Sequence, residues 1–182
     1  MRLFIGIKLS EQVREKLCEI CRDLKERASQ MKWVKEDNVH ITLKFLGETE
    51  KRDQIIGILD NKISASRFTL KFTGLGKFGR GDELRVLWAG IEQSDRFNAL
   101  FNEIESGLEP IGFPKEQRKF SPHITLGRNR YGKVHQDLIN EIDRLADHSF
   151  GEQEIFSFQL MSSTLTLSGP IYKTLFSFPT GK

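Results

Sequence analysis

Long apolar runs are missing from this sequence of 182 residues, so we expect no segment of it to cross a bilayer as a helix. The opening residues, M-R-L-F-I-G-I-K, turn polar too soon to resemble a signal peptide. With 38% apolar and 29% charged residues, the composition is typical of a soluble globular protein. We therefore expect a cytoplasmic protein without a membrane span.

Cysteine is scarce, and the two residues present, Cys18 and Cys21, form a C-x-x-C pair. A zinc site needs further ligands, and the sequence has neither a second cysteine pair nor a suitably spaced histidine cluster. Both cysteines fall in a helical apolar pattern with Val13 and Leu17, which favours core packing over redox or metal chemistry. We expect neither a metal nor a cofactor.

The excess of positive charge is also small, because 28 lysine and arginine residues face 25 aspartate and glutamate residues. A net charge of +3 allows a phosphate-bearing partner without requiring one. Basic residues do gather between 115 and 133, where either a phosphate site or an ordinary solvated loop explains them. These residues are Lys115, Arg118, Lys119, Arg128, Arg130 and Lys133.

What the sequence does contain is one tetrapeptide twice: H-I-T-L stands at 40–43 and again at 123–126. Side chains alternate between the two faces of a strand, so histidine and threonine share one face while isoleucine and leucine share the other. The apolar face can be buried, whereas the polar face must meet water or a ligand. Two such strands brought together give two imidazoles and two hydroxyls to one small site.

These groups suit phosphoryl chemistry without a metal. A neutral imidazole accepts a proton near neutral pH, an imidazolium donates one, and threonine hydroxyls donate hydrogen bonds to phosphate oxygens. A metal site is disfavoured, because His40 and His123 are only two strong ligands and no carboxylate accompanies either motif. His135 and His148 stand near the ends of a predicted helix, and we expect them to be structural or solvent-facing.

The spacing of apolar residues predicts both helices and strands, with a glycine-rich loop at 74–83. Ser10 and Ser94 are expected to cap two of the helices. Predicted helices cover 11–30, a stretch around 55–59, 95–108 and 134–147, and predicted strands cover 2–9, 40–47, 68–72, 85–91, 123–126, 155–160, 164–168 and 171–178.

The two motif copies also indicate an internal duplication. Their offset of 83 residues sends Ile55 onto Leu138 and Leu59 onto Ile142, so the apolar faces of the following helices match. An alternating strand follows each of these helices. We predict that residues 1–182 form a single domain of two similar lobes, related by a pseudo-twofold axis that brings the motif strands together.

The two motifs and several other segments resemble those of a known family. H40-I-T-L-K-F-L-G-E48 and F120-S-P-H-I-T-L-G-R128 resemble the two signature motifs of the 2H phosphoesterase superfamily, in particular of its LigT-like branch, the RNA 2′,3′-cyclic phosphodiesterases or 2′-5′ RNA ligases. L3-F-I-G-I7, K32-W-V-K-E-D-N38 and R85-V-L-W-A-G-I91 resemble the same branch. The resemblance implies a bilobal α+β fold with an antiparallel sheet and outer helices in each lobe around a central cleft.

The resemblance further implies hydrolysis of a terminal ribose 2′,3′-cyclic phosphate of RNA to a 2′-phosphate. His40 would protonate the leaving 3′ oxygen, His123 would activate the attacking water, and Thr42 and Thr125 would hold the phosphate. The near-symmetric motifs by themselves do not say which histidine is the acid and which is the base. The implied substrates are RNA ends with a cyclic phosphate, among them tRNA fragments, or cyclic nucleotides, bound by a monomer.

Arg128 is a candidate for phosphate binding, because the family has an arginine five residues after the second histidine. Strict alternation would place Arg128 on the face opposite His123, unless Gly127 rotates the end of the strand. Arg130 is the second candidate for the same role.

Aromatic and basic residues elsewhere could contact the rest of an RNA substrate. Trp33 or Phe45 could stack on a base, and Trp33 is the preferred of the two. Lys77 and Arg80 in the loop 76–83 could hold the RNA backbone. Two other functions stay open: 2′-5′ ligation or cleavage at the same site, and RNA or nucleotide binding without turnover.

Overall fold

The computed structural model describes residues 1–28, 30–80, 83–167 and 169–181. Two short 3-10 helices lie at Glu36–Asn38 and Glu109–Ile111. The α-helices are α1 (Glu11–Lys25), α2 (Arg52–Lys62), α3 (Asp95–Leu108) and α4 (Gln136–Arg144), and the strands are β1 (Arg2–Lys8), β2 (Lys32–Trp33), β3 (His40–Glu48), β4 (Phe68–Phe78), β5 (Val86–Ile91), β6 (His123–Arg128), β7 (Ser149–Ile155), β8 (Ser157–Thr166) and β9 (Gly169–Pro179).

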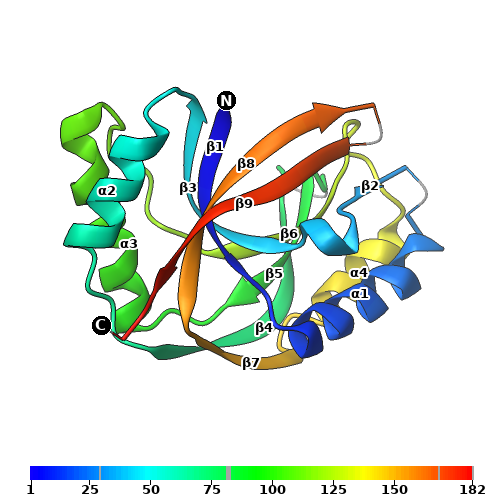
Figure 1. The fold of residues 1–182 in the computed structure, drawn as a ribbon. Coiled ribbons are helices and arrows are strands. Elements are labelled where there is room, and N and C mark those ends of the chain that lie inside the picture. Colours follow the sequence, from blue (N-terminus) through cyan, green and yellow to red (C-terminus); the bar gives the residue numbers. More distant parts are fainter. Residues whose placement is uncertain (29, 81–82, 168, 182) are drawn as a thin grey trace.

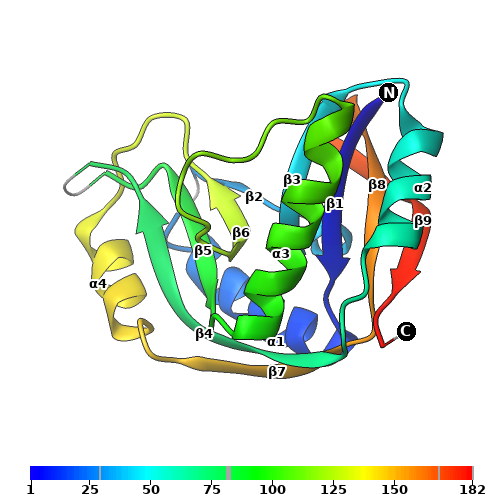
Figure 2. The same cartoon turned by 90° about the vertical axis from the view of Figure 1, so that its left-hand side faces the viewer.

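The strands form two antiparallel sheets, which confirms the predicted α+β fold with two lobes. One sheet has the order β3-β1-β8-β9, and the other has the order β2-β6-β5-β4-β7. In Figure 1, α2 and α3 lie on one side of the molecule and α1 and α4 on the other. Figure 2, turned by 90°, shows α3 running beside β3, and α3 contacts both β3 and β4.

The two sheets repeat one plan. Each motif strand pairs with an earlier strand from which a long helix separates it in the chain. β3 pairs with β1, which comes before α1, and β6 pairs with β5, which comes before α3. The next strand in each sheet comes from the repeat that carries the other motif: β8, which follows the second motif, lies beside β1, and β4, which follows the first motif, lies beside β5. Neither lobe is therefore a continuous segment of the chain, because each repeat contributes one strand, β4 or β8, to the sheet of the other.

The starts of α1 and α3 were predicted correctly from their capping residues. Ser10 Oγ accepts a hydrogen bond from Val13 N, and Ser94 Oγ accepts one from Phe97 N. Cys18 and Cys21 lie free and buried on the inner face of α1, which confirms their role in the core. Burial raises the pKa of the Cys21 thiol to about 12, so its reactive thiolate form is disfavoured.

The predicted loop at 74–83 was wrong over its first half. β4 continues as a strand to Phe78 and pairs with β5, while residues 81 and 82 lie outside the described part of the chain. The glycines serve close packing instead of a turn: a Cβ on Gly76 would lie 2.2 Å from the Trp88 ring, and one on Gly74 would lie 2.1 Å from the Ala146 carbonyl.

One apolar cluster runs through both lobes, drawing buried residues from both sheets and from α1, α2, α3 and α4. Among the described residues, none of the helices combines the length and the hydropathy needed to cross a bilayer.

Candidate active site

The two motif strands are neighbours in space, because β3 of one sheet contacts β6 of the other. Within each motif the burial follows the predicted alternation. His40 and Thr42 are half-buried while Ile41 is buried, and the pattern repeats for the second motif, with Ile124 buried between His123 and Thr125. The apolar face of each motif thus anchors it in the core, and the polar face stays accessible.

Both catalytic candidates are held in the same way by the chain just before them. His40 Nδ1 lies 2.7 Å from Asn38 O, and His123 Nδ1 lies 2.9 Å from Ser121 O. A carbonyl oxygen can only accept, so Nδ1 carries the proton in each neutral ring. The lone pair therefore sits on Nε2 of both histidines, which fixes the atom that can take up or release a proton.

The first motif also shows a contact between its two polar residues. Thr42 Oγ1 lies 3.0 Å from His40 Nε2, and the hydroxyl donates to this nitrogen when the ring is neutral. Burial lowers the pKa of His40, and the hydrogen bond to the Asn38 carbonyl offsets this only in part. His40 is therefore held toward its neutral form in the free protein.

Aromatic rings surround both imidazoles. His40 contacts Phe4 of β1, at a centroid distance of 4.9 Å, and Tyr172 of β9, at 5.1 Å and edge-on, and these two rings also contact each other at 5.0 Å. His123 meets Phe78 of β4 edge-on at 5.1 Å. Trp88 of β5 lies farther from His123, at 6.4 Å. These rings fix the plane of each imidazole, and at His40 they exclude water and so contribute to the lowered pKa.

Arg128 lies at the end of a bulged strand. Leu87 of β5 pairs with Gly127 and Trp88 pairs with Thr125, so Leu126 is an extra residue in β6. A bulge of this kind shifts the alternation by one, and it returns Arg128 to the face of His123. The sequence suggested a rotation of the strand end at Gly127, whereas the strand pairing places the irregularity at Leu126.

The same bulge occurs in the first motif, and sequence analysis missed it. Ile5 of β1 pairs with Lys44 and Gly6 pairs with Thr42, so Leu43 is the extra residue in β3. This turns Phe45 to the face of His40. Phe45 and Arg128 therefore occupy equivalent positions, each five residues after a motif histidine.

Tyr172 connects Arg128 with the first motif. Burial raises the pKa of the Tyr172 hydroxyl, while the nearby guanidinium groups of Arg128 and Arg2 act in the opposite direction. The Tyr172 ring also contacts His40. The positive charge of Arg128 on β6 thus acts near the first motif on β3. Arg2 is a further cation there that sequence analysis did not single out.

Two weaker candidates, Arg130 and Trp33, lie near the end of β6 and contact neighbouring parts of the protein. Arg130 lies beyond the end of β6, in a turn where its carbonyl oxygen accepts from Arg85 Nη1 at 2.6 Å. Trp33 is half-buried against the core and donates through Nε1 to Ala28 O at 3.4 Å. Its ring packs beside Gly127, one residue before Arg128. The candidate cation Lys77 donates to the carbonyl of Glu83.

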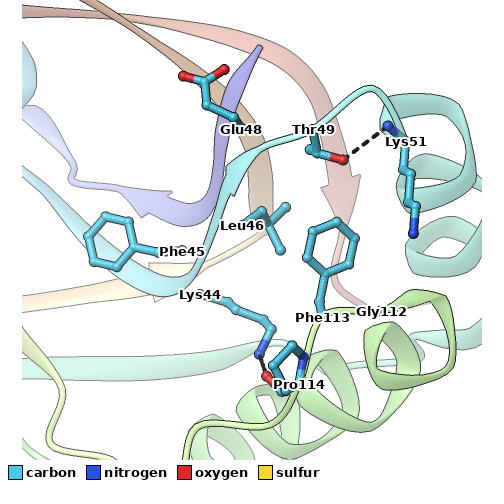
Figure 3. A pocket seen from close by; sticks show the side chains of 9 residues that line it. All are labelled: Lys44, Phe45, Leu46, Glu48, Thr49, Lys51, Gly112, Phe113 and Pro114. Atoms are coloured by element: carbon cyan, nitrogen blue, oxygen red, sulfur yellow. Dashed lines mark hydrogen bonds between the residues drawn. The ribbon is translucent and has the colours of Figure 1, made fainter.

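A pocket of about 390 Å³ opens beside the end of β3 (Figure 3), and the residues that line it do not include the motif histidines. Lys44 and Phe45 both line it, but they project in different directions, with Lys44 turned toward Pro114. Lys44 Nζ donates to Pro114 O at 2.8 Å and to Glu105 Oε1 at 2.7 Å. Sequence analysis missed this pair, although a charged residue within the apolar stripe of α3 is a signal for one.

No group of three or more His, Cys, Asp or Glu side chains that could hold a metal ion occurs in the described ranges 1–28, 30–80, 83–167 and 169–181. The groups present at the site can carry out acid–base transfer at two Nε2 atoms, hydrogen bonding by two hydroxyls, and neutralisation of an anion by Arg128.

Comparison with known proteins gives consistent matches. A family model described as "2′-5′ RNA ligase superfamily" matches residues 11–159. The RNA 2′,3′-cyclic phosphodiesterase of Thermotoga maritima is 37% identical over 180 residues, which cover 97% of this chain and 94% of that protein. The RNA 2′,3′-cyclic phosphodiesterase of Methanocaldococcus jannaschii is 34% identical, with 96% of this chain and 98% of that protein covered.

Solved structures agree with the fold. The crystal structure of TT0787 of Thermus thermophilus has a TM-score of 0.83 and 28% identity, covering 98% of this chain and 97% of that one. Escherichia coli LigT complexed with NADP+ has a TM-score of 0.79 and 27% identity, covering 100% of this chain and 98% of that one.

Proposed function

The chain belongs to the 2′-5′ RNA ligase superfamily, and from this premise we propose that it is an RNA 2′,3′-cyclic phosphodiesterase. It hydrolyses the cyclic phosphate at the end of an RNA and leaves a 2′-phosphate. The observation that carries this proposal is the pair of motif histidines on neighbouring strands, each with Nδ1 bound to a carbonyl, which leaves Nε2 as the nitrogen that can exchange a proton. The names of relatives at 34–37% identity support the same activity.

In the proposed reaction, His123 Nε2 takes a proton from water while the water oxygen bonds to phosphorus. The bond from phosphorus to the 3′ oxygen breaks, and that oxygen receives the proton from His40 Nε2. The products are a 2′-phosphate and a free 3′-hydroxyl. Proton exchange with solvent then returns both imidazoles to their starting states, so the reaction needs no metal and no cofactor.

Thr42, Thr125 and Arg128 bind the phosphate in this proposal. Hydroxyl donors and a guanidinium aimed at the non-bridging oxygens stabilise the charge that builds up at phosphorus, an effect worth roughly a few kcal/mol per donor. Arg130 stays the second candidate for this role. Trp33 supports the end of β6, since its ring packs beside Gly127.

His40 must gain a proton before it can act as the acid, because burial lowers its pKa in the free protein. The negative charge of a bound phosphodiester supplies the reason: an anion beside Nε2 favours the imidazolium and raises the pKa again. The Thr42 hydroxyl then no longer donates to His40 and can turn to a phosphate oxygen. Substrate binding and charging of the acid are thus coupled.

The substrate class is an RNA end with a 2′,3′-cyclic phosphate, tRNA fragments included, or a cyclic nucleotide. We further propose that the protein acts as a monomer in the cytoplasm, with its two lobes forming a single domain.

The test is hydrolysis of an oligonucleotide ending in a 2′,3′-cyclic phosphate, in excess chelator, with the position of the product phosphate identified. We expect a 2′-phosphate, and we expect His40→Ala and His123→Ala each to lower kcat by about 10²- to 10⁴-fold. His148→Ala is the matched control, because His148 is exposed and its ring contacts that of Phe150. Near wild-type rates in both motif variants would overturn the mechanism, and a joined 2′-5′ product would identify ligation instead.

A further inference from the structure

Asn38, two residues before the first motif histidine, is a polar side chain that is only 9% exposed. It ends the short 3-10 helix Glu36–Asn38. A buried amide is costly unless it forms hydrogen bonds, and Asn38 Nδ2 donates to Pro170 O at 2.7 Å. Because a carbonyl oxygen can only accept, the amide nitrogen is the atom that faces Pro170. The side chain of Asn38 is thus tied to a strand 132 residues later in the chain.

This hydrogen bond spans the four-stranded sheet. Pro170 lies in β9, and β9 and β3 are the two outer strands of the order β3-β1-β8-β9. Only Val39 separates Asn38 from the start of β3. Two residues after Pro170, the ring of Tyr172 meets that of His40 edge-on at 5.1 Å. The side chain of Asn38 therefore holds β9 beside the first motif at the place where β9 presents a ring to His40.

The main chain of the same residue contacts the imidazole. Asn38 O lies 2.7 Å from His40 Nδ1 and accepts its proton. Two backbone bonds close the turn around this carbonyl, since Asn38 N donates to Lys35 O at 2.8 Å and Val39 N donates to Glu36 O at 3.1 Å. One residue thus binds β9 through its side chain and the catalytic candidate through its carbonyl.

The second motif holds its histidine without such an anchor. His123 Nδ1 lies 2.9 Å from Ser121 O, but Ser121 is exposed. The next residue is Pro122, whose ring fixes its own φ and restricts the conformation of Ser121. The first motif has Val39 in place of this proline, so no ring restrains the chain there. The side-chain bond of Asn38 supplies the restraint instead.

We propose that Asn38 is a positioning residue for His40: its side chain fixes the carbonyl that holds Nδ1 and so keeps Nε2 directed at the leaving 3′ oxygen. The assignment rests on the proposed function. The carbonyl also stabilises the imidazolium, because its bond to Nδ1 raises the pKa of His40 and opposes the effect of burial. Asn38 takes no part in proton transfer itself.

The first test is Asn38→Leu, which removes the amide donor and keeps a side chain of similar size. We expect kcat for adenosine 2′,3′-cyclic phosphate to fall about 10- to 100-fold, because a displaced acid misses the leaving oxygen. KM should change less than about threefold, since the loss falls on the transition state.

NMR titration of the same variant separates positioning from stability. The pKa of His40 is expected to fall below its wild-type value, and the ring nitrogen signals of neutral His40 should show both tautomers. The His123 ring is the internal control and should keep its wild-type pKa. A residue that only stabilises the fold would reduce the amount of folded enzyme without changing His40 in the folded fraction. An unchanged His40 pKa and tautomer would overturn the assignment, whatever the rate.

A matched control removes the same bond elsewhere. Asn61 Nδ2 in α2 donates to Gly57 O, also at 2.7 Å. Asn61→Leu is expected to leave kcat and the His40 pKa unchanged. A change as large as that of Asn38→Leu would show that loss of any such amide bond perturbs the enzyme, and the assignment would fall.

The second test uses the wild type and needs neither a folded variant nor turnover. The side-chain amide protons of buried Asn38 are expected to exchange with solvent more slowly than those of exposed Asn61, and equal rates would overturn the assignment. A wild type that hydrolyses no cyclic phosphate, together with a changed His40 pKa in Asn38→Leu, would refute the proposed function and keep the anchor of the ring. Hydrolysis by the wild type with an unchanged His40 in the variant would refute the anchor alone.

Discussion

Lys44 and Glu105 form an ion pair inside the protein, with Lys44 Nζ donating to Glu105 Oε1 at 2.7 Å and side chains only 7% and 5% exposed. Lys44 also donates to Pro114 O, and Glu105 Oε2 accepts from Glu116 N at 2.7 Å. The pair therefore joins the first motif strand to α3 and to the segment that leads into β6. It therefore links the strand of the first motif to the segment that precedes the second motif.

Removing one partner of this pair is expected to destabilise the protein strongly. Lys44→Met leaves the Glu105 carboxylate buried without its cation, which costs about 3–5 kcal/mol in the free energy of unfolding. The double variant Lys44→Met, Glu105→Leu recovers most of the loss, because no buried charge remains. Urea unfolding measures both. The exposed pair Lys115–Glu109 is the control, and Lys115→Met is expected to change little; a similarly small effect of Lys44→Met would contradict the prediction.

The sequence predicted the elements of the fold better than their arrangement. Helix starts followed from Ser10 and Ser94, and the motif strands followed from alternation, because caps and periodicity are local properties. The exchange of β4 and β8 between the lobes did not follow, since an alternating strand has the same pattern whichever sheet it joins. The extension of β4 was hidden by glycines that make room for Trp88.

The chemical groups of the candidate site were predictable, but two of its side-chain directions were not. A bulge arises from pairing between strands, and the pairs β1–β3 and β5–β6 join segments separated by a whole helix. The directions of Phe45 and Arg128 depend on those bulges. The partner of Glu105 could not be predicted from the sequence either. A charged residue in an apolar stripe indicates that an ion pair forms, but it does not indicate which residue is the partner.

Arg128 is expected to contribute more to phosphate binding than Arg130. Arg128→Gln removes the cation that the bulge turns to the His123 face, and we expect kcat/KM to fall at least about tenfold. Arg128→Lys recovers only part of this, because an ammonium group cannot form the paired contacts of a guanidinium. Steady-state kinetics on a cyclic nucleotide measures both. Arg130→Gln is the comparison, and a larger loss there than in Arg128→Gln would transfer the role to Arg130.

Gly6 is expected to tolerate no side chain. A Cβ at this position of β1 would lie 2.7 Å from Ile41 O and 3.5 Å from His40 Cδ2, so Gly6→Ala must displace the strand that carries the catalytic candidate. We expect lower stability and slower hydrolysis in this variant. Gly57→Ala is the control, because its Cβ meets nothing within 4 Å on α2 and should stabilise the protein by about 0.5–1 kcal/mol. A wild-type rate in Gly6→Ala would contradict the prediction.

The lowered pKa of His40 predicts a pH-dependent stability. The imidazole of the unfolded chain has a pKa near 6.5, and burial places that of folded His40 below it. Between these two values the unfolded chain binds a proton that the folded protein does not. The free energy of unfolding is therefore full above about pH 6.5 and falls as the pH drops toward the folded pKa. Urea unfolding across this range should show a shallower decline for His40→Asn, and identical slopes would contradict the prediction.

The same pKa should rise when an anion binds. NMR titration of the His40 ring is expected to give a pKa below 6.5 in the free protein and a higher value with adenosine 2′-phosphate, because a phosphate beside Nε2 favours the imidazolium. The His148 ring, exposed and next to Phe150, serves as the internal control and should not respond to the ligand. A His40 pKa that stays low with the ligand bound would leave this residue unable to donate a proton, and the acid would then have to be His123.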